Sequence, residues 1–456
     1  MVSHKGKTLL FDPWLVGSCY WRSWWNYPKV DKSLIEDLKP DFIFITHLHW
    51  DHFHGPSLRK FSLDTPVIVP KLQFSRMKDD LNQIGFKNII ELDHGGRHKI
   101  LDDFEITSYQ FNFLICDSAV VVQAGGVTLL NANDAKFMGL PLKQIMKNHP
   151  KIDFVFRSHS SANERLCYEV FEEIQDYQPD EMKYIESFRA FCERVGARYA
   201  VPFASNNCHL HPETMRFNKA IQTPLMVRNY FKQRDIRTPE LKIMIRGDSW
   251  SEEGGFVLQS PDSFYNEREK LLESYQAEQG EVLRRQDEKE GRAKVTLKEF
   301  ERYFIPFMKA VPFFLRRKFK GRPITFVFRS KMGEFVFQVD LYRKKITQEN
   351  SYSDNTNPLQ IHAPAFIGKQ ALALKMVDQM AISKRIRFRS SLSDQKLLQL
   401  YTLCHLLFEH HLLPILGNFK WRSLRLFLLR WREAALFLGI AKDLLLGRRF
   451  QEANYL

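Results

Sequence analysis

The sequence predicts an α/β protein with a C-terminal α+β and helical extension. Over the first 255 or so residues, short apolar runs alternate with amphipathic stretches, which is the pattern of strands and helices packed in layers. A charged stretch then interrupts the pattern, and a hairpin signal near 323–341 and helical periodicity from about 394 follow it.

These changes divide the 456 residues into four segments. Residues 1–258 form the α/β segment, and residues 259–296 are rich in Glu, Lys, Arg and Gln and predict a charged helical linker. Residues 297–393 predict a small α+β domain, and residues 394–456 predict a basic helical region. A chain of this length has room for two or three domains.

Four apolar runs in the first segment are expected to be strands. Each of them is followed by turn or polar residues, so the ends of these strands present side chains to a shared edge. The runs cover residues 41–46, 66–70, 118–122 and 127–130.

Composition excludes several classes of protein. The chain is 44% hydrophobic and 26% charged, as in globular proteins. Its six cysteines form no C-x-x-C pair, which excludes a disulfide-rich scaffold, a zinc site of paired cysteine knuckles and an in-chain Rieske cluster. The net charge, 67 − 53 = +14, favours anionic partners, but no nucleic-acid-binding module accompanies it. No signal-peptide layout is present, and no apolar run approaches the ~18 residues of a membrane span, so a cytoplasmic setting is expected.

The strongest functional signal is the heptapeptide Thr46-His47-Leu48-His49-Trp50-Asp51-His52. It places four potential metal ligands within six residues, directly after the apolar run Phe42-Ile43-Phe44-Ile45. Imidazoles and a carboxylate suit Zn, Fe or Mn, and two clustered pairs of ligands leave room for two cations. A histidine-rich surface loop is the alternative, and ligand type and spacing argue against it.

The H-x-H-x-D-H pattern resembles the metallo-β-lactamase superfamily. The flanking motifs resemble the metal-binding half of CMP-N-acetylneuraminate hydroxylase and its bacterial relatives, over roughly residues 7–250. These motifs are FDPWL at 11–15, CDSAVVV at 116–122, LNAND at 130–134, VPFAS at 201–205, HP at 211–212 and GDSW at 247–250. The resemblance implies that residues 1–258 form an αββα metallo-β-lactamase-like catalytic domain.

The resemblance also implies a set of ligands. His47 and His49 would hold one metal, and Asp51 and His52 the other. Asp134 would take the place of the bridging carboxylate, although it also suits a helix N-cap. His211 would supply a late ligand, with His209 and Cys208 as competitors and a surface-loop histidine as the alternative.

The chain departs from the superfamily pattern between His52 and Asp134, where another histidine ligand is usual. His94 and His98 fall in that interval but in an expected turn, and the ligand is otherwise Asn112 or Asp117. The chain also contains no Rieske cysteines and histidines to supply electrons.

The implied chemistry is hydrolysis by a metal-bound hydroxide, with two divalent ions, Zn in a hydrolase or Fe in an oxygenase, lowering the pKa of water. Asp51 is the candidate for orienting that water, and Asp12 for holding a ligand histidine in one tautomer. The expected substrate is a polar, anionic small molecule. An iron-dependent oxygenase acting on a CMP-sialic-acid-like or other acylated amine, with a separate reductase, is the alternative. A non-catalytic metal-binding or lipid-binding protein is the third possibility.

The C-terminal half faintly resembles a sterol-carrier-like module, although a packing or dimerisation domain is favoured. Near the end, apolar residues between 421 and 438 recur at helical spacing, with arginines interspersed. This stripe fits a helix on a membrane surface. Packing on the preceding helical stretch, with the arginines solvated, is the favoured alternative.

Overall fold

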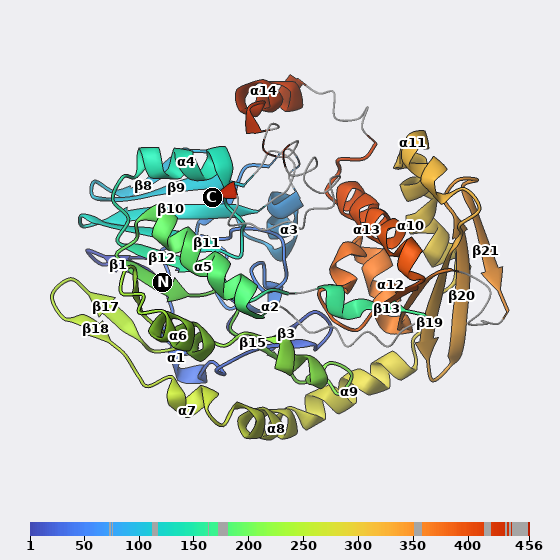
Figure 1. Ribbon diagram of the computed structural model, residues 1–456, viewed down its shortest axis with the longest axis horizontal. Helices are drawn as coiled ribbons and strands as arrows, with labels where there is room; N and C mark the ends of the chain where they lie inside the picture. Colours follow the sequence, from blue (N-terminus) through green and yellow to red (C-terminus); the bar gives the residue numbers. More distant parts are fainter. Residues whose placement is uncertain are drawn as a thin grey trace.

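The computed structural model describes residues 1–456 except 73, 75, 112–116, 163, 172–180, 351–357, 415–420, 434, 435, 437, 438 and 440–454. Two lobes make up the molecule, and the linker helices run along one side of it (Figure 1). The larger lobe holds two facing sheets, and the smaller lobe holds a third sheet covered by helices.

The first sheet of the large lobe has five strands in the order β1-β2-β5-β6-β7. Strands β2, β5, β6 and β7 run parallel, as expected where helices connect them. The strands are β1 (Val2–His4), β2 (Lys7–Phe11), β5 (Phe42–Phe44), β6 (Val67–Pro70) and β7 (Ile89–Leu92).

The second sheet has seven strands in the order β16-β14-β12-β11-β10-β9-β8. Strands β8 to β11 are antiparallel neighbours, and β11, β12, β14 and β16 are parallel. The strands are β8 (Gly96–Leu101), β9 (Phe104–Gln110), β10 (Ser118–Ala124), β11 (Val127–Asn133), β12 (Phe154–Arg157), β14 (Tyr199–Pro202) and β16 (Glu240–Leu241).

An apolar core joins these two sheets. Leu9, Phe44 and Ile68 of the first sheet pack against Ile106 and Val120 of the second. Helices cover the outer faces: α2 (Gly55–Leu58) and α3 (Arg76–Ile84) on the first sheet, and α4 (Gly139–Asn148), α5 (Glu181–Val195) and α6 (Pro224–Gln233) on the second. The expected αββα arrangement of a metallo-β-lactamase fold is confirmed.

Smaller elements lie beside this sandwich. A three-stranded sheet is formed by β3 (Ser18–Cys19), β4 (Trp24–Asn26) and β15 (Asn207–His209). Strands β17 (Ser249–Ser251) and β18 (Gly255–Val257) form a hairpin, and α1 (Lys32–Glu36) precedes β5. The charged segment contains helices α7 (Asp262–Tyr265), α8 (Arg268–Glu278) and α9 (Gly280–Gly291).

The small lobe is built on a six-stranded sheet in the order β13-β23-β22-β19-β20-β21. Its strands are β19 (Ile324–Ser330), β20 (Gly333–Asp340), β21 (Lys345–Glu349), β22 (Leu359–Pro364), β23 (Arg387–Ser390) and β13 (Tyr168–Val170). Helices α10 (Leu297–Ala310), α12 (Ala365–Leu374) and α13 (Gln395–Glu409) pack on it through a core rich in phenylalanine. Strand β13 comes from the first segment, so the division at residue 258 does not separate the two lobes completely. A three-residue edge strand carries too little pattern to be found in sequence.

The C-terminal stripe is placed differently from the favoured expectation. Helix α14 (Trp421–Arg430) leaves Trp421, Leu424 and Leu428 exposed instead of packing them on α13. Ala435 and Leu438, which continue the stripe, lie outside the described residues. Among the described residues, no helix combines the length and the apolar character that a membrane span needs.

Candidate metal centre

Three chain segments meet where strands of the two sheets end. Strand β5 leads through Ile45 into the motif that begins at Thr46, β2 leads into Asp12, and β11 leads into Asp134. Asp12 (φ +40°) and Asn133 (φ +42°) adopt left-handed backbone conformations, which aspartate and asparagine tolerate better than other non-glycine residues. These sharp turns direct the polar side chains toward one another.

Asp134 lies between two histidines of the motif. Its Oδ1 atom is 3.6 Å from Nε2 of His47 and 3.4 Å from Nε2 of His52. The Nε2 atom of His52 also lies 3.5 Å from Oδ2 of Asp51. Tetrahedral metal–ligand bonds of about 2.0–2.1 Å separate ligand atoms by about 3.3–3.4 Å. The spacing therefore matches that of ligand atoms around a metal cation.

The neighbouring hydrogen bonds engage Nδ1 of His47 and His52 and turn Nε2 of each ring toward Asp134. The Nδ1 atom of His52 is 2.9 Å from Asp12 Oδ2, and only a protonated Nδ1 can donate to that carboxylate. The Thr46 hydroxyl donates to Asp12 Oδ2 (2.8 Å), so it accepts from Nδ1 of His47 at 3.0 Å. In both rings Nε2 is then the nitrogen that faces Asp134, as metal ligation by Nε2 requires.

Burial and charge fit a cation at this position. Asp134 Oδ1 is buried and has no hydrogen-bond partner in the protein, a costly state for a carboxylate oxygen. Burial raises the pKa of Asp134 and lowers that of His47 well below its usual value. Burial opposes protonation of His52, but Asp134, Asp51 and Asp12 outweigh it and raise its pKa to about 10. This excess of negative charge is what a divalent cation would neutralise.

His49 completes the group. Its Nδ1 atom lies 2.8 Å from Nε2 of His47, and atoms of His47, His49 and Asp134 all fall within 4.8 Å of one another. The structure thus brings together all four motif residues and Asp134.

Tyr20 holds Asp51 in place, a contact that the sequence did not indicate. Its hydroxyl donates to Asp51 Oδ1 (2.7 Å) and accepts from the backbone N–H of Trp50 (3.1 Å). Tyr20, Trp21 and Arg22 all have positive φ angles, between +49° and +67°. A left-handed backbone conformation costs about 1–2 kcal/mol for each of these residues. Tertiary contacts must therefore stabilise this turn, and no pattern of residue types in the sequence predicts it.

The small lobe contacts the loop of the histidine motif and its neighbouring strands through tryptophans. The indole N–H of Trp21 donates to Gln370 Oε1 (2.8 Å), and that of Trp24 donates to the carbonyl of Ile382 (2.9 Å). Trp50, inside the motif, is 3.1 Å from the sulfur of Met376. The C-terminal lobe therefore restricts the loop that carries His47 to His52.

A cavity of about 450 Å³ opens beside Asp51 and His52. This volume suits a small organic molecule. Its walls combine apolar and polar side chains, among them Trp14, Asn131, Phe156, Phe203, Ser205 and Arg246.

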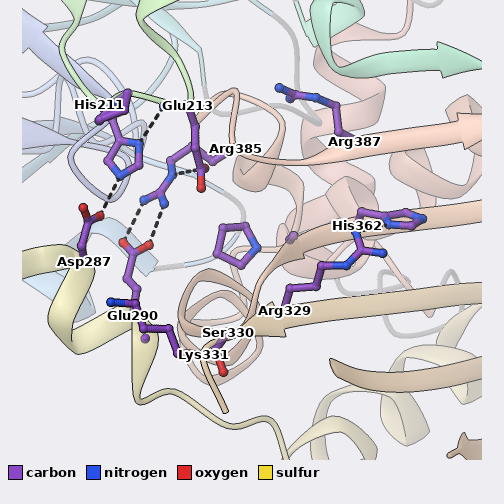
Figure 2. A pocket seen from close by; sticks show the side chains of 14 residues that line it. His211, Glu213, Asp287, Glu290, Arg329, Ser330, Lys331, His362, Arg385 and Arg387 are labelled. Atoms are coloured by element: carbon purple, nitrogen blue, oxygen red, sulfur yellow. Dashed lines mark hydrogen bonds and ion pairs between the residues drawn. The ribbon is translucent and has the colours of Figure 1, made fainter. Parts of the chain in front are cut away.

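The structure places His211 elsewhere, in a second group with Asp287 and Glu290 (Figure 2). The backbone N–H of Glu213 donates to Nδ1 of His211 (3.3 Å), so the neutral ring carries its proton on Nε2, 3.4 Å from Asp287 Oδ1. Both oxygens of Glu290 accept hydrogen bonds from Arg385. His211 therefore offers a donor rather than a lone pair.

The competitors of His211 are also engaged elsewhere. The Nδ1 atom of His209 lies 3.2 Å from the Ser23 hydroxyl, and burial lowers the pKa of this histidine to about 3. Cys208 is buried in an apolar cluster with Trp25 and Tyr27.

Among the described residues between His52 and Asp134, Asp117 remains the candidate for a further metal ligand. His94 uses both ring nitrogens, accepting from the backbone N–H of Gln110 and contacting Gln144 Oε1. His98 lies on β8 against Phe42. The pKa of Asp134 is raised by burial, then by the charge of Asp51, and then by the charge of Asp117, which therefore lies near it. Asn112 lies outside the described residues.

Comparison with curated proteins finds partial relatives. The chain is 26% identical over 235 residues to a Mycobacterium tuberculosis protein named for a Rieske 2Fe-2S iron–sulfur centre, covering 48% of this chain and 44% of the relative. It is 31% identical over 141 residues to cytidine monophosphate-N-acetylneuraminic acid hydroxylase of Xenopus laevis, covering 28% of this chain and 23% of the relative. The matches thus span less than half of these proteins. No family model matches the chain.

Solved structures with a similar course of the chain include a variant of the CmlA β-hydroxylase, with 17% identity and a TM-score of 0.37 over 53% of this chain and 50% of that one. An isothiocyanate hydrolase from Delia radicum gut bacteria has 16% identity and a TM-score of 0.38 over 54% of this chain and 92% of that one. The molecule has the metallo-β-lactamase fold, on the evidence of its own sheets and motif, and part of its sequence is similar to the CMP-N-acetylneuraminate hydroxylases.

Proposed function

We propose that this protein is a metal-dependent hydrolase that uses two divalent cations to act on a polar, anionic small molecule. The observation that carries the proposal is the position of Asp134 Oδ1, buried, without a hydrogen-bond partner and 3.4–3.6 Å from two histidine nitrogens. A divalent cation beside Asp134 would offset the cost of leaving this buried carboxylate oxygen without a partner.

The contacts support the ligand assignment that the resemblance implies. His47 and His49 would hold one cation, Asp51 and His52 would hold the other, and Asp134 would serve both. Bound cations would supply a water whose pKa is lowered toward neutrality. Asp12 and Thr46 keep His47 and His52 in the ligating tautomer, and Tyr20 fixes the carboxylate of Asp51, which orients that water.

The cavity beside Asp51 and His52 supports a small-molecule substrate. Its apolar side chains, Trp14, Phe156 and Phe203, suit the body of a substrate, and Asn131 and Ser205 offer hydrogen bonds. Arg246, which is paired with Asp31, lines the same cavity. The net charge of +14 favours an anionic substrate.

The first test is the metal content of protein purified without added metal. We expect zinc in amounts that reach two per chain on reconstitution, together with hydrolysis of a substrate from a panel of anionic esters, lactones and phosphodiesters. His47→Ala is expected to remove both the metal and the activity, while Val257→Asn, on the exposed β17–β18 hairpin, serves as a control. Protein that binds no transition metal, or that hydrolyses equally well as the His47→Ala variant, contradicts the proposal.

An iron-dependent oxygenase is the second candidate, and the curated relatives favour it. They are named for a Rieske centre and for a hydroxylase. The same ligands would hold iron, and electrons would come from a separate reductase or Rieske protein. Iron in the purified protein and oxygen consumption that depends on an electron donor would replace hydrolysis with this reaction.

We also propose a reducing, cytoplasmic setting. The cysteines that the structure describes, Cys19, Cys167, Cys192, Cys208 and Cys404, are all buried thiols that form no disulfide. Fractionation of the producing cell would test this location.

A further inference from the structure

Helix α14 and the residue after it expose an apolar surface that is unusual for a globular protein. The exposed fractions are 76% for Trp421, 44% for Leu424, 44% for Phe427, 57% for Leu428, 70% for Leu429 and 55% for Trp431. Single exposed apolar side chains are ordinary, but six within eleven residues form a patch of the kind that marks an interaction site.

The helix is nevertheless fixed to the large lobe. Arg430 is buried, donates from Nη2 to the backbone carbonyl of Gln110 (2.8 Å) and pairs with Glu433 (2.6 Å). Gln110 is the last residue of strand β9 and pairs with Ser118 of strand β10. The hydroxyl of Ser118 donates to the backbone carbonyl of Thr46 (2.6 Å). The exposed apolar side chains are therefore carried on the edge of the lobe that bears the candidate metal centre.

The exposed charges on this surface are positive. Arg425 and Arg432 are exposed, and the guanidinium of Arg432 lies 5.8 Å from the ring centre of Trp431. The sequence from 415 to 432 contains no Asp or Glu, and the next acid, Glu433, is buried against Arg430.

A second patch of the same character lies on the small lobe. Helix α11 (Phe313–Arg316) exposes Phe313 and Phe314, and the exposed Arg317, Lys318 and Lys320 follow it. Both α14 and α11 project from the upper edge of the molecule in Figure 1. Two aromatic and basic patches on one edge suit a broad, flat partner better than a groove on a folded protein.

We propose that this edge docks on an anionic lipid surface, with Trp421, Leu428 and Trp431 inserted at the interface and Arg425 and Arg432 on the headgroups. Aromatic and leucine side chains bind the boundary between headgroups and acyl chains, and nearby arginines add attraction to anionic lipids. Docking in this way would hold the metal centre beside the lipid surface, whatever reaction it performs.

Vesicle co-sedimentation of the full-length, metal-loaded protein tests the proposal. We expect binding to phosphatidylcholine vesicles that contain phosphatidylserine, weak binding to phosphatidylcholine alone, and release at high salt. Trp421→Ala combined with Trp431→Ala is expected to weaken binding about tenfold or more. Arg425→Gln and Arg432→Gln are each expected to weaken it roughly fivefold.

The matched control is Val257→Asn with Leu258→Asn, two exposed apolar residues at the end of the β17–β18 hairpin, which lies away from α14 in Figure 1. This control should leave binding unchanged. Circular dichroism and metal content should match wild type in every variant. Equal binding to both kinds of vesicle, or equal binding of the tryptophan variant, overturns the proposal. A lipid-free dimer that the tryptophan substitutions dissociate also overturns it, because a second copy then covers the surface.

Discussion

Two groups of histidine and acid lie in this molecule, and they differ in the tautomer of the histidine. In the group of His47, His52 and Asp134, Asp12 and Thr46 accept from the Nδ1 atoms, so the Nε2 atoms face the carboxylate of Asp134. In the second group, a backbone N–H donates to Nδ1 of His211, so Nε2 carries the proton.

The acids of the two groups differ as well. Asp134 Oδ1 is buried and has no hydrogen-bond partner in the protein. Glu290 and Glu213 are both bonded to the buried guanidinium of Arg385, and Asp287 is half exposed. The first group has an unbalanced negative charge, whereas Arg385 already balances most of the second. Ligand type and distance alone do not separate a metal site from a structural ion pair; the outer hydrogen bonds do.

The largest expected difference between the groups is in metal binding. Asp134→Asn removes the shared ligand, so we expect the bound metal to fall to one per chain or less. Asp287→Asn makes the same change in the second group and should leave the metal content unchanged. Elemental analysis after gel filtration measures both, and loss of metal from the Asp287 variant would show that the second group also binds a cation.

The next effect concerns the residue that fixes the tautomer. Asp12→Asn keeps the shape of the side chain but weakens the acceptor for Nδ1 of His52. Substitution of such outer residues costs about 10–100-fold in metal affinity. Competition with a chromogenic chelator measures this change. Unaltered affinity would mean that Asp12 serves only the backbone of the loop, through Thr46.

A stability effect is expected in the second group. Arg385→Met leaves Glu290 and Glu213 without their partner and costs about 3 kcal/mol or more in the free energy of unfolding, as for other buried ion pairs. Metal content should remain that of wild type. Urea denaturation gives the free energy, and a change below about 1 kcal/mol would indicate that the pair is solvated.

The effect that is smallest per pH unit is the pH dependence of stability in the metal-free protein. The folded-state pKa of His52 is about 10, above the value of about 6.5 in unfolded chains. Its contribution to stability is therefore fully present below about pH 6.5 and is lost as the pH rises through about 10.

His211 acts in the opposite direction. Burial and then the charge of Arg385 lower its pKa, so its contribution is present above about pH 6.5 and is lost as the pH falls below that value. Each histidine contributes a slope of at most about 1.4 kcal/mol per pH unit. We expect His52→Gln to flatten the alkaline side of the stability profile and His211→Gln the acid side. Urea denaturation between pH 5 and 9 in a chelating buffer measures both, and identical profiles would contradict the assignment.

The sequence by itself determined the layered α/β class, the strands that lead to the site, and the residues His47 to His52 with Asp134. These features depend on local periodicity and on ligands close together in the chain, which a single sequence displays. The tautomer of each histidine, the placement of His211 beside Asp287, the contact of Tyr20 with Asp51 and the exposure of α14 were decided only by the tertiary structure. Each depends on groups brought together from distant parts of the chain, such as Asp12 with His52 or Arg385 with Glu290, and no local pattern of residues specifies such contacts.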